Sequence, residues 1–536
     1  MNASQKSGRY FLEDAGVPTD PISNNKPIKL KYHAGGQWKT SQTDLYMPCY
    51  NPSTGAVIAM APQCLPEEVE EAVAAAATAF PVWSNTPVSK RVQVLYNMKH
   101  LLDKHLEELT VLLATEQGKK YQEAMGDILK VTEVVEFACG APHLMKGEAL
   151  MQVSTGYDTV LYREPVGVFA GIPPWNFPAM IPHGWMTPIC IATGNCMVLK
   201  AASFVPQSAM RVLELWQEAG IPDGVINLVT AGRDQAELLL RHPTIKGITF
   251  VGSTKVGLHI YSTAAAHGKR VQALCEAKNH ALVLRDCKLE RAAAGIINAF
   301  TGCAGERCMA LPTVVVENAI ADKLVALLKE NAAQINLGPA WRQDTGMGPV
   351  VNAGHQQFVE KWIATAVKEG AELALDGRNP KVAPGCEKGF FVGPTIVDHV
   401  TEDMSCGREE VFGPVVFVKR VESFEEGLCL MNNSRFGNGS VIYTQNGYYA
   451  REFAQRTHAG MVGINVGIPV PLGIFGFTGH KQSFFGDLHV MGKDGFAFFT
   501  ESKCVTNTWF PEEGGDLAAC KVDTWDGTIT SLPKGN

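Results

Sequence analysis

The stretch Gly167-Val-Phe-Ala-Gly-Ile-Pro-Pro-Trp-Asn-Phe-Pro178 begins the pattern that decides the fold. Its first six residues are small or apolar and predict a buried β-strand, which the following prolines end. Because Trp175, Asn176 and Phe177 lie between prolines, we expect a rigid loop at the end of this strand. The loop holds a polar amide between aromatic rings.

Further short apolar runs follow this strand at regular intervals. They lie at residues 196–199, 225–229 and 247–251, and segments with helical character separate them. Strands that alternate with helices of about 10–15 residues predict a parallel sheet wrapped by helices. The expected fold class is therefore α/β, with ligands bound at the carboxyl ends of the strands.

Other segments extend this plan. Residues 65–80 and 90–116 predict helices, and a second α/β series begins near residue 282. Residues 152–164 predict an outlying hairpin, and residues 495–509 alternate like an edge strand. An edge strand favours pairing between subunits, so we expect a homodimer or homotetramer.

Composition limits the class of protein. A chain of 536 residues is too long for one ordinary core and indicates two or three domains. The formal charge of −7 includes no block of Lys and Arg, which disfavours a nucleic-acid partner. The 14 cysteines lack paired zinc-type spacing, so we expect no metal site and favour a reducing compartment.

Two segments bear on location. Residues 180–199 form the longest apolar stretch, but His183, Gly184 and Asn195 favour a buried helix and strand over a membrane span. The first 28 residues mix acidic and basic side chains and lack the apolar core of a secretory signal. We expect a cytoplasmic protein with no membrane partner, with the mitochondrial matrix as the alternative.

Cys308 is a candidate nucleophile in the segment Phe300-Thr-Gly-Cys-Ala-Gly-Glu-Arg-Cys-Met-Ala-Leu311. Arg307 beside it favours the thiolate, which is the form that attacks a carbonyl carbon. The alternative is common, because a free cysteine is often only a small buried apolar residue.

Three segments at strand ends or at a rigid corner add polar groups, each with a structural alternative. Asn176 offers an N–H to an oxygen that becomes negative, or belongs to an ordinary turn. Gly252 and Ser253 open a helix and suit a pyrophosphate, or Ser253 is only a helix cap. Glu410 precedes a Gly-Pro corner, where a carboxylate binds ribose hydroxyls or lies in a solvated acidic turn.

Together these segments resemble the aldehyde dehydrogenase superfamily over roughly residues 28–510. The resemblance is carried by Pro-Trp-Asn-Phe-Pro at 174–178, Met-Val-Leu-Lys at 197–200, Phe-Val-Gly-Ser at 250–253, Gly-Glu-Arg-Cys at 305–308 and Glu-Val-Phe-Gly-Pro at 410–414. Motifs at 277–280, 304–310, 463–471 and 475–484 are most similar to the CoA-acylating methylmalonate-semialdehyde dehydrogenases.

The resemblance implies a mechanism and a set of site residues. Cys308 attacks the aldehyde, Asn176 and the Cys308 backbone N–H hold the oxyanion, and hydride passes to NAD. Coenzyme A then takes the acyl group, and β-carboxylated substrates lose carbon dioxide to give propionyl-CoA or acetyl-CoA. The implied cofactor contacts are Pro174, Trp175, Lys200, Ser203, Gly252, Ser253, Cys275, Glu410 and Phe412, and the implied substrate contacts are Arg307 and Lys130.

The acceptor of the acyl group depends on a missing base. Hydrolytic members of the superfamily carry a Glu at the position of Leu274, and without it water is poorly activated. Glu276 stands two residues later, where the family has Gly, and returns to the same face of a strand. A hydrolytic enzyme that uses Glu276 as its base is therefore one alternative. A non-catalytic relative is the other, because the chain departs from the family at several site positions.

Two of these departures concern the ligands. Residues 201–204 lack the Glu that the branch carries there, so a 2′-phosphate meets less repulsion and NADP is an alternative cofactor. Lys130 replaces an Arg, which keeps the charge and loses the bidentate fork.

The resemblance also implies a domain plan. We expect a Rossmann-type NAD-binding domain at 29–151 and 166–277, and an α/β catalytic domain at 278–485. Bridging strands for oligomerisation are expected at 152–165 and 486–512, with an N-terminal extension at 1–28 and a tail at 513–536.

Overall fold

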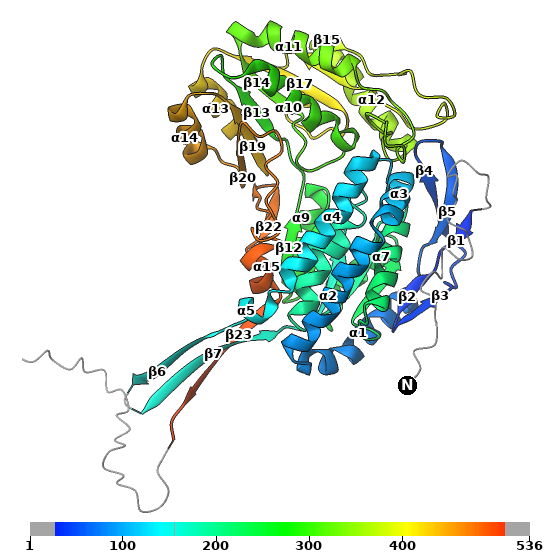
Figure 1. Ribbon diagram of the computed structural model, residues 1–536, viewed down its shortest axis with the longest axis vertical. Helices are drawn as coiled ribbons and strands as arrows, with labels where there is room; N and C mark the ends of the chain where they lie inside the picture. Colours follow the sequence, from blue (N-terminus) through cyan, green and yellow to red (C-terminus); the bar gives the residue numbers. More distant parts are fainter. Residues whose placement is uncertain (1–26, 155, 510–536) are drawn as a thin grey trace, which may run out of the picture.

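The structure is a computed structural model that describes residues 27–154 and 156–509. All but the last two residues of the expected N-terminal extension, and the whole expected tail, lie outside these ranges. Within them, the predicted α/β class is confirmed: two large, mostly parallel sheets form the centres of two lobes (Figure 1).

The first of these described sheets has eight strands in the order β22-β12-β11-β8-β9-β10-β2-β3. Its central strands are parallel, and antiparallel pairs add β22 at one edge and β2 and β3 at the other. The strands are β2 (Tyr32–Ala34), β3 (Gln37–Lys39), β8 (Val168–Ile172), β9 (Cys196–Ala201), β10 (Ile226–Thr230), β11 (Ile245–Val251), β12 (Arg270–Leu274) and β22 (Phe484–Gly486).

Helices pack against this sheet, and two of the predicted helices differ from the observed ones. The helix predicted at 65–80 continues past Pro81 to Asn85, and the one predicted at 90–116 is broken at His105, where the backbone leaves helical geometry (φ −103°, ψ 14°). The helices are α1 (Pro66–Asn85), α2 (Val88–Lys104), α3 (Leu106–Gln117), α4 (Tyr121–Ala138), α5 (Ala141–Leu144), α6 (Thr187–Ala192), α7 (Gln207–Glu218), α8 (Arg233–Arg241) and α9 (Thr254–Ala266), and a π-helical turn, η1, spans Ile181–Met186.

Residues 180–199 are buried throughout as η1, α6 and the start of β9, as the sequence predicts. In the part of the chain that the structure describes, no helix is both long and apolar enough to cross a membrane.

The strand order places a crevice at the carboxyl ends of β8 and β11. From β8 the sheet runs through β9 to β10 on one side, whereas β11 and β12 lie on the other side. The connections therefore leave β8 and β11 in opposite directions, which is where open α/β sheets bind ligands. The loop that contains Asn176 follows β8, and Gly252 follows β11.

The second large sheet in the described residues has seven strands in the order β15-β16-β17-β14-β13-β19-β20. Every pair is parallel except β15 with β16. Its strands are β13 (His280–Val283), β14 (Thr313–Glu317), β15 (Glu372–Leu375), β16 (Thr395–Asp398), β17 (Val415–Val421), β19 (Gly439–Tyr443) and β20 (Met461–Ile464). Its helices are α10 (Leu289–Thr301), α11 (Asn318–Ala333), α12 (Ala353–Lys368), α13 (Phe424–Asn433) and α14 (Gly447–Arg456), with 3₁₀ turns η2 (Gly302–Gly305) and η3 (Ser405–Gly407).

Smaller sheets complete the described fold. One joins β1 (Ile28–Lys29), β5 (Ala56–Pro62) and β4 (Tyr46–Asn51), and another pairs β18 (Phe436–Gly437) with β21 (His480–Lys481). A third joins β6 (Glu148–Ser154), β7 (Tyr157–Pro165) and β23 (Thr500–Asn507) into an arm that projects from the body (Figure 1).

The arm confirms the predicted hairpin and corrects the predicted edge strand. Only Thr500–Asn507 form that strand, because Gly492–Phe498 form a helix, α15. Phe496 and Phe498 on α15 are buried against Phe137 and Phe169, so their alternation reflects packing of a short helix.

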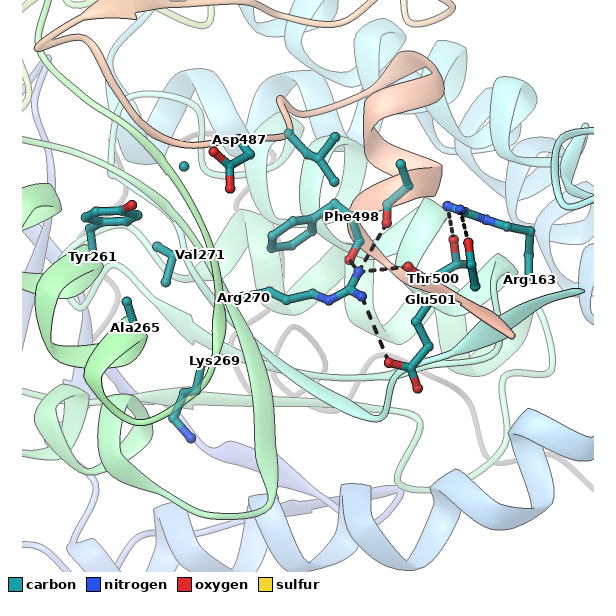
Figure 2. Close-up of a pocket in the computed structure, with 14 residues that line it drawn as sticks. Arg163, Tyr261, Ala265, Lys269, Arg270, Val271, Asp487, Phe498, Thr500 and Glu501 are labelled. Carbon is teal, nitrogen blue, oxygen red and sulfur yellow. Dashed lines mark hydrogen bonds and ion pairs between the residues drawn. The ribbon is translucent and has the colours of Figure 1, made fainter. Parts of the chain in front are cut away.

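Arginines brace the arm where it leaves the body. Arg270 donates to the carbonyl oxygens of Phe498 (2.9 Å) and Thr500 (2.7 Å), and Arg163 donates to the hydroxyls of Thr500 and Ser502 (Figure 2). These contacts border a cavity of about 540 Å³ between α9, β12 and the base of the arm. This cavity is separate from the crevice at the strand ends.

Candidate active site

The candidate site lies where the two large sheets meet end to end. The first sheet contributes the carboxyl ends of β8, β9 and β11. The second contributes the segments that enter its strands: Asn279 precedes β13, Cys308 precedes β14, Glu410 precedes β17 and Asn438 precedes β19. The site therefore combines strand ends of opposite polarity.

Two asparagines hold the backbone of Cys308. The Nδ2 atoms of Asn279 and Asn438 donate to the Cys308 carbonyl oxygen at 2.7 and 2.9 Å. Asn279 also accepts from the Gly439 N–H at 2.8 Å, which ties the thiol segment to β19. Asn279 lies in the 277–280 motif that the sequence singles out, whereas no pattern in the sequence points to Asn438.

The Cys308 thiol is protonated at neutral pH in this state. Its pKa is raised to about 12, first by burial and then by Glu410, whereas the Cys308 N–H and Arg307 lower it. Arg307 thus acts in the predicted direction, but burial outweighs it. Cys303 is buried as well, and its backbone N–H is held by Glu123 at 2.8 Å.

Asn176 points its amide at the segment that carries the thiol. Its Nδ2 donates to the Glu306 carbonyl oxygen at 3.0 Å, and its side chain is buried. Asn176 is the predicted oxyanion donor, and its amide reaches the residue two positions before Cys308.

A buried ion pair supports Asn176 from behind. The Lys119 ammonium donates to the Asn176 carbonyl oxygen at 2.7 Å and to Asp127 at 2.9 Å, and it lies 3.5 Å from the centre of the Phe177 ring. Asp127 in turn accepts from the Met180 N–H at 2.7 Å. Both charged side chains have no exposed surface. This pair was not predicted from the sequence, because single charged residues in or near helical segments follow no recognisable pattern.

Glu306 fixes the other side of the thiol segment. Its carboxyl accepts from Gln117 at 3.1 Å and from the Val351 N–H at 2.9 Å, and burial raises its pKa well above the usual range. The segment before Cys308 is therefore anchored to α3 and to the loop before α12.

Lys200 lies at the end of β9 and lacks a partner of its own. Burial lowers the pKa of its ammonium to about 8. No residue that the structure describes makes a hydrogen bond or ion pair with it. A buried ammonium with no protein partner fits a ligand that supplies oxygen acceptors.

Aromatic rings line the neighbouring part of the crevice. The Trp175 ring meets Phe412 at 5.6 Å and His355 at 5.3 Å between centroids. Phe412 has a positive φ of 54°, and its carbonyl oxygen accepts from His355 at 2.7 Å. Trp175 and Phe412, both predicted as cofactor contacts, are therefore neighbours.

Two carboxylates face the space between the sheets. Glu410 accepts from the Ala277 N–H at 3.2 Å, and burial raises its pKa to about 8, with nearby Glu276 as the next cause. Glu276 accepts from the Thr254 N–H, at the start of α9, at 3.0 Å. Among the described residues, no carboxylate is hydrogen-bonded to the Cys308 thiol.

Residues 38–505 match the model of the aldehyde dehydrogenase family. The chain belongs to the aldehyde dehydrogenase family. It is 46% identical over 480 residues to malonate-semialdehyde dehydrogenase 2 of Geobacillus kaustophilus, covering 90% of this chain and 99% of that one.

Solved structures agree with this family and with the predicted fold. A methylmalonate-semialdehyde dehydrogenase from Oceanimonas doudoroffii is 41% identical, with a TM-score of 0.89, and covers 90% of this chain and 99% of that one. A Sinorhizobium meliloti protein named for the same activity and solved with NAD is 38% identical, with a TM-score of 0.89, over 91% and 99%. The predicted superfamily is confirmed.

The remaining predicted cofactor contacts of this aldehyde dehydrogenase differ in exposure. Ser253 is exposed at the start of α9, and its side chain makes no capping hydrogen bond. Ser203 donates to the Ala231 carbonyl oxygen at 3.4 Å. The Cys275 thiol is buried toward α9, where a Cβ on Gly257 would lie 2.2 Å from its sulfur. The roles of these residues, with Pro174 and Gly252, stay predictions.

The two predicted substrate contacts of the enzyme are already bound to other groups. Arg307 donates to the carbonyl oxygens of Asn298 and Ala299 at the end of α10, and its buried Nε has no partner among the residues described. Lys130 donates to Glu133 at 2.8 Å and to the Pro471 carbonyl oxygen at 3.0 Å.

The position of the hydrolytic base is apolar in this enzyme. Leu274 is the last residue of β12, is 5% exposed and pairs with Phe484 of β22. The described part of the chain also contains no group of three or more His, Cys, Asp or Glu residues arranged to hold a metal ion.

Proposed function

We propose that the enzyme oxidises malonate semialdehyde or methylmalonate semialdehyde with NAD and coenzyme A, giving acetyl-CoA or propionyl-CoA and carbon dioxide. The observation that carries this proposal is that the Asn176 amide donates to the Glu306 carbonyl oxygen, two residues before Cys308, in a site whose base position is the buried Leu274. The names of the relatives support the substrate class.

In this reaction the chain supplies a nucleophile and an oxyanion donor. Cys308 attacks the aldehyde carbon after losing its proton, and the Asn176 N–H and the Cys308 backbone N–H stabilise the negative oxygen. Lys119 keeps Asn176 in place through the Asn176 carbonyl oxygen. NAD, when bound, accepts the hydride.

The polar groups of the crevice fit NAD. Lys200 has an ammonium without a partner among the described residues, and Glu410 is a largely buried carboxyl; both would bind ribose hydroxyls. Ser253 and Gly252 would hold the pyrophosphate at the start of α9. Pro174, Trp175, Ser203, Cys275 and Phe412 would complete the cofactor site, with NADP as the alternative dinucleotide.

Arg307 and Lys130 would bind the substrate carboxylate. For Arg307, the unpartnered Nε is an available donor, so the guanidinium gains a hydrogen bond when it turns toward a carboxylate. Lys130 lies beside the 463–471 motif through its bond to Pro471. The Lys130 side chain can pair with a carboxylate through its ammonium, but it lacks the bidentate fork of an Arg.

Coenzyme A, rather than water, would take the acyl group from Cys308. The buried Leu274 cannot deprotonate water, and Glu276 is bonded at α9 instead of at the thiol. A thiol forms its own nucleophile more easily than water does, so it needs less help from the protein.

The test is NADH formation on a panel of aldehydes, with and without coenzyme A, for the wild type and Cys308→Ala. We expect an acyl-CoA product that requires coenzyme A, and a loss of at least about 10⁴-fold in Cys308→Ala. Formation of free acid without coenzyme A would support the hydrolytic alternative. Absence of NADH with every aldehyde would support the non-catalytic one.

We also propose that the arm joins subunits into a dimer or tetramer. Strand β6 is exposed along its length and carries the apolar side chains Leu150, Met151 and Val153. Exposed apolar residues on an edge strand are typical of a pairing surface. Light scattering after gel filtration of the wild type and of a Leu150→Lys, Val153→Lys variant tests this, and a monomeric wild type would contradict it.

The domain boundaries and the compartment also remain proposals. We propose an NAD-binding domain at 29–151 and 166–277 and a catalytic domain at 278–485, with the strand β22 at the end of the latter pairing into the first sheet. A reducing compartment such as the cytoplasm is supported by the free state of every cysteine in the described residues.

A further inference from the structure

Glu276 combines a fixed backbone with a movable carboxylate. Its carbonyl oxygen accepts from the Ser483 hydroxyl at 2.7 Å, and the N–H of Cys275 donates to the Ser483 carbonyl oxygen at 2.8 Å. The residue is half-buried, and its side-chain Oε2 accepts from the Thr254 N–H at 3.0 Å. The backbone is therefore anchored, while the carboxylate is free to leave α9.

The carboxylate contacts the helix start that the proposed function assigns to the pyrophosphate. Thr254 is the first residue of α9, a helix of 13 residues. Its N–H is one of the donors at the positive end of the helix that have no partner within the helix itself. Ser253 before it makes no capping bond through its side chain. The Thr254 N–H, which the proposed pyrophosphate site would offer to the cofactor, thus already donates to the Glu276 carboxylate.

Glu410 adds a second acidic group to the same space. Glu276 is the largest cause after burial of the raised pKa of Glu410, so the two carboxyls lie close enough to repel each other. Lys200 faces the crevice without a protein partner. A cofactor that binds here would therefore contact the Lys200 ammonium at β9 and the Glu276 carboxylate at the start of α9.

From this arrangement, we propose that Glu276 competes with the pyrophosphate of the cofactor for the start of α9, and so sets the affinity of the enzyme for NAD. The proposal rests on the proposed function, because it assumes that NAD binds in this crevice. Binding requires Glu276 to leave the Thr254 N–H, and its return favours release of the dinucleotide.

The test measures binding directly, by calorimetry with NAD and with ADP-ribose, which keeps the pyrophosphate and lacks nicotinamide. The variants are Glu276→Gly and the isosteric, neutral Glu276→Gln. The matched control is Glu237→Gln, which removes another carboxylate that contacts α9, through His259 at 2.7 Å. It lies away from the first residue of the helix.

We expect the dissociation constants of both ligands to fall roughly tenfold in Glu276→Gly, less in Glu276→Gln, and not at all in the control. Unchanged or weaker binding in both Glu276 variants would overturn the proposal, because it would make Glu276 a helix cap only. Loss of free-acid formation at unchanged affinity would also overturn it, in favour of a base. Absence of NAD binding in the wild type would overturn the proposed function together with this inference.

Discussion

The thiol half and the cofactor half of the site differ in how their polar groups are satisfied. In the thiol half, Asn176 and Lys119 have partners within the chain, and the Cys308 carbonyl oxygen is held by two asparagines. In the cofactor half, Lys200 has no partner among the described residues, and burial and nearby Glu276 raise the pKa of Glu410.

This difference separates chemistry from ligand exchange. Donors that stabilise a transition state act best when the protein has already fixed them, since no reorganisation is needed during the reaction. Groups that bind an exchangeable ligand keep unmatched charge until the ligand arrives. Substitutions in the thiol half should therefore affect stability and kcat, and those in the cofactor half affinity and pH dependence.

The largest effect is expected from breaking the buried Lys119–Asp127 ion pair that supports the thiol half. Lys119→Met leaves Asp127 buried without its partner, so we expect a loss of about 3–5 kcal/mol in the free energy of unfolding by urea. The double variant with Asp127→Leu should recover most of this stability without recovering kcat. A loss below about 1 kcal/mol in the single variant would contradict the view that this buried ion pair stabilises the fold.

A second change removes the proposed oxyanion donor alone. Asn176→Ala should lower kcat by about 10²–10³-fold while the dissociation constant for NAD stays the same. Asn446→Ala, which removes the cap of α14 far from the site, is the matched control and should keep full kcat. Equal kcat in Asn176→Ala and this control would exclude Asn176 from the oxyanion site.

A third change tests the raised pKa of Glu410 in the cofactor half. The pKa of Glu410 is about 8 in the folded state, above the ordinary value of 4.5, so the folded protein keeps a proton that the unfolded chain loses between these values. The stability that this proton provides is complete below pH 4.5 and is lost as the pH rises to 8.

Urea unfolding at pH 5, 6.5 and 8 measures this component. The stability of the wild type relative to Glu410→Gln should fall by roughly 2–4 kcal/mol over that range. Parallel pH profiles for the two proteins would mean that Glu410 is not protonated in the folded state.

The smallest expected effect concerns the thiol itself. Because burial raises the pKa of Cys308 to about 12, the rate of its alkylation by iodoacetamide should rise about tenfold per pH unit between pH 7 and 10. Mass spectrometry of the Cys308 peptide measures the rate, and Cys308→Ala assigns it. A plateau below pH 9 would indicate a thiol activated without a ligand.

The sequence predicted the central sheet well because each of its strands is a short apolar run between helices. It was less accurate where one pattern fits two structures. Phe496 and Phe498 alternate as in a strand, yet both are buried from α15. The break at His105 was missed because apolar spacing continues on both sides of it.

The sequence by itself determined the family and the residues at the carboxyl ends of the first sheet, and it predicts the nucleophile, because these lie in contiguous motifs. Only the tertiary structure decided what those residues contact. Lys119 reaches Asn176 across 57 positions, Asn438 reaches Cys308 across 130, and Glu276 turns to α9 instead of the thiol. Such contacts depend on how two sheets meet and on which buried charge finds a partner, and neither is encoded in local spacing.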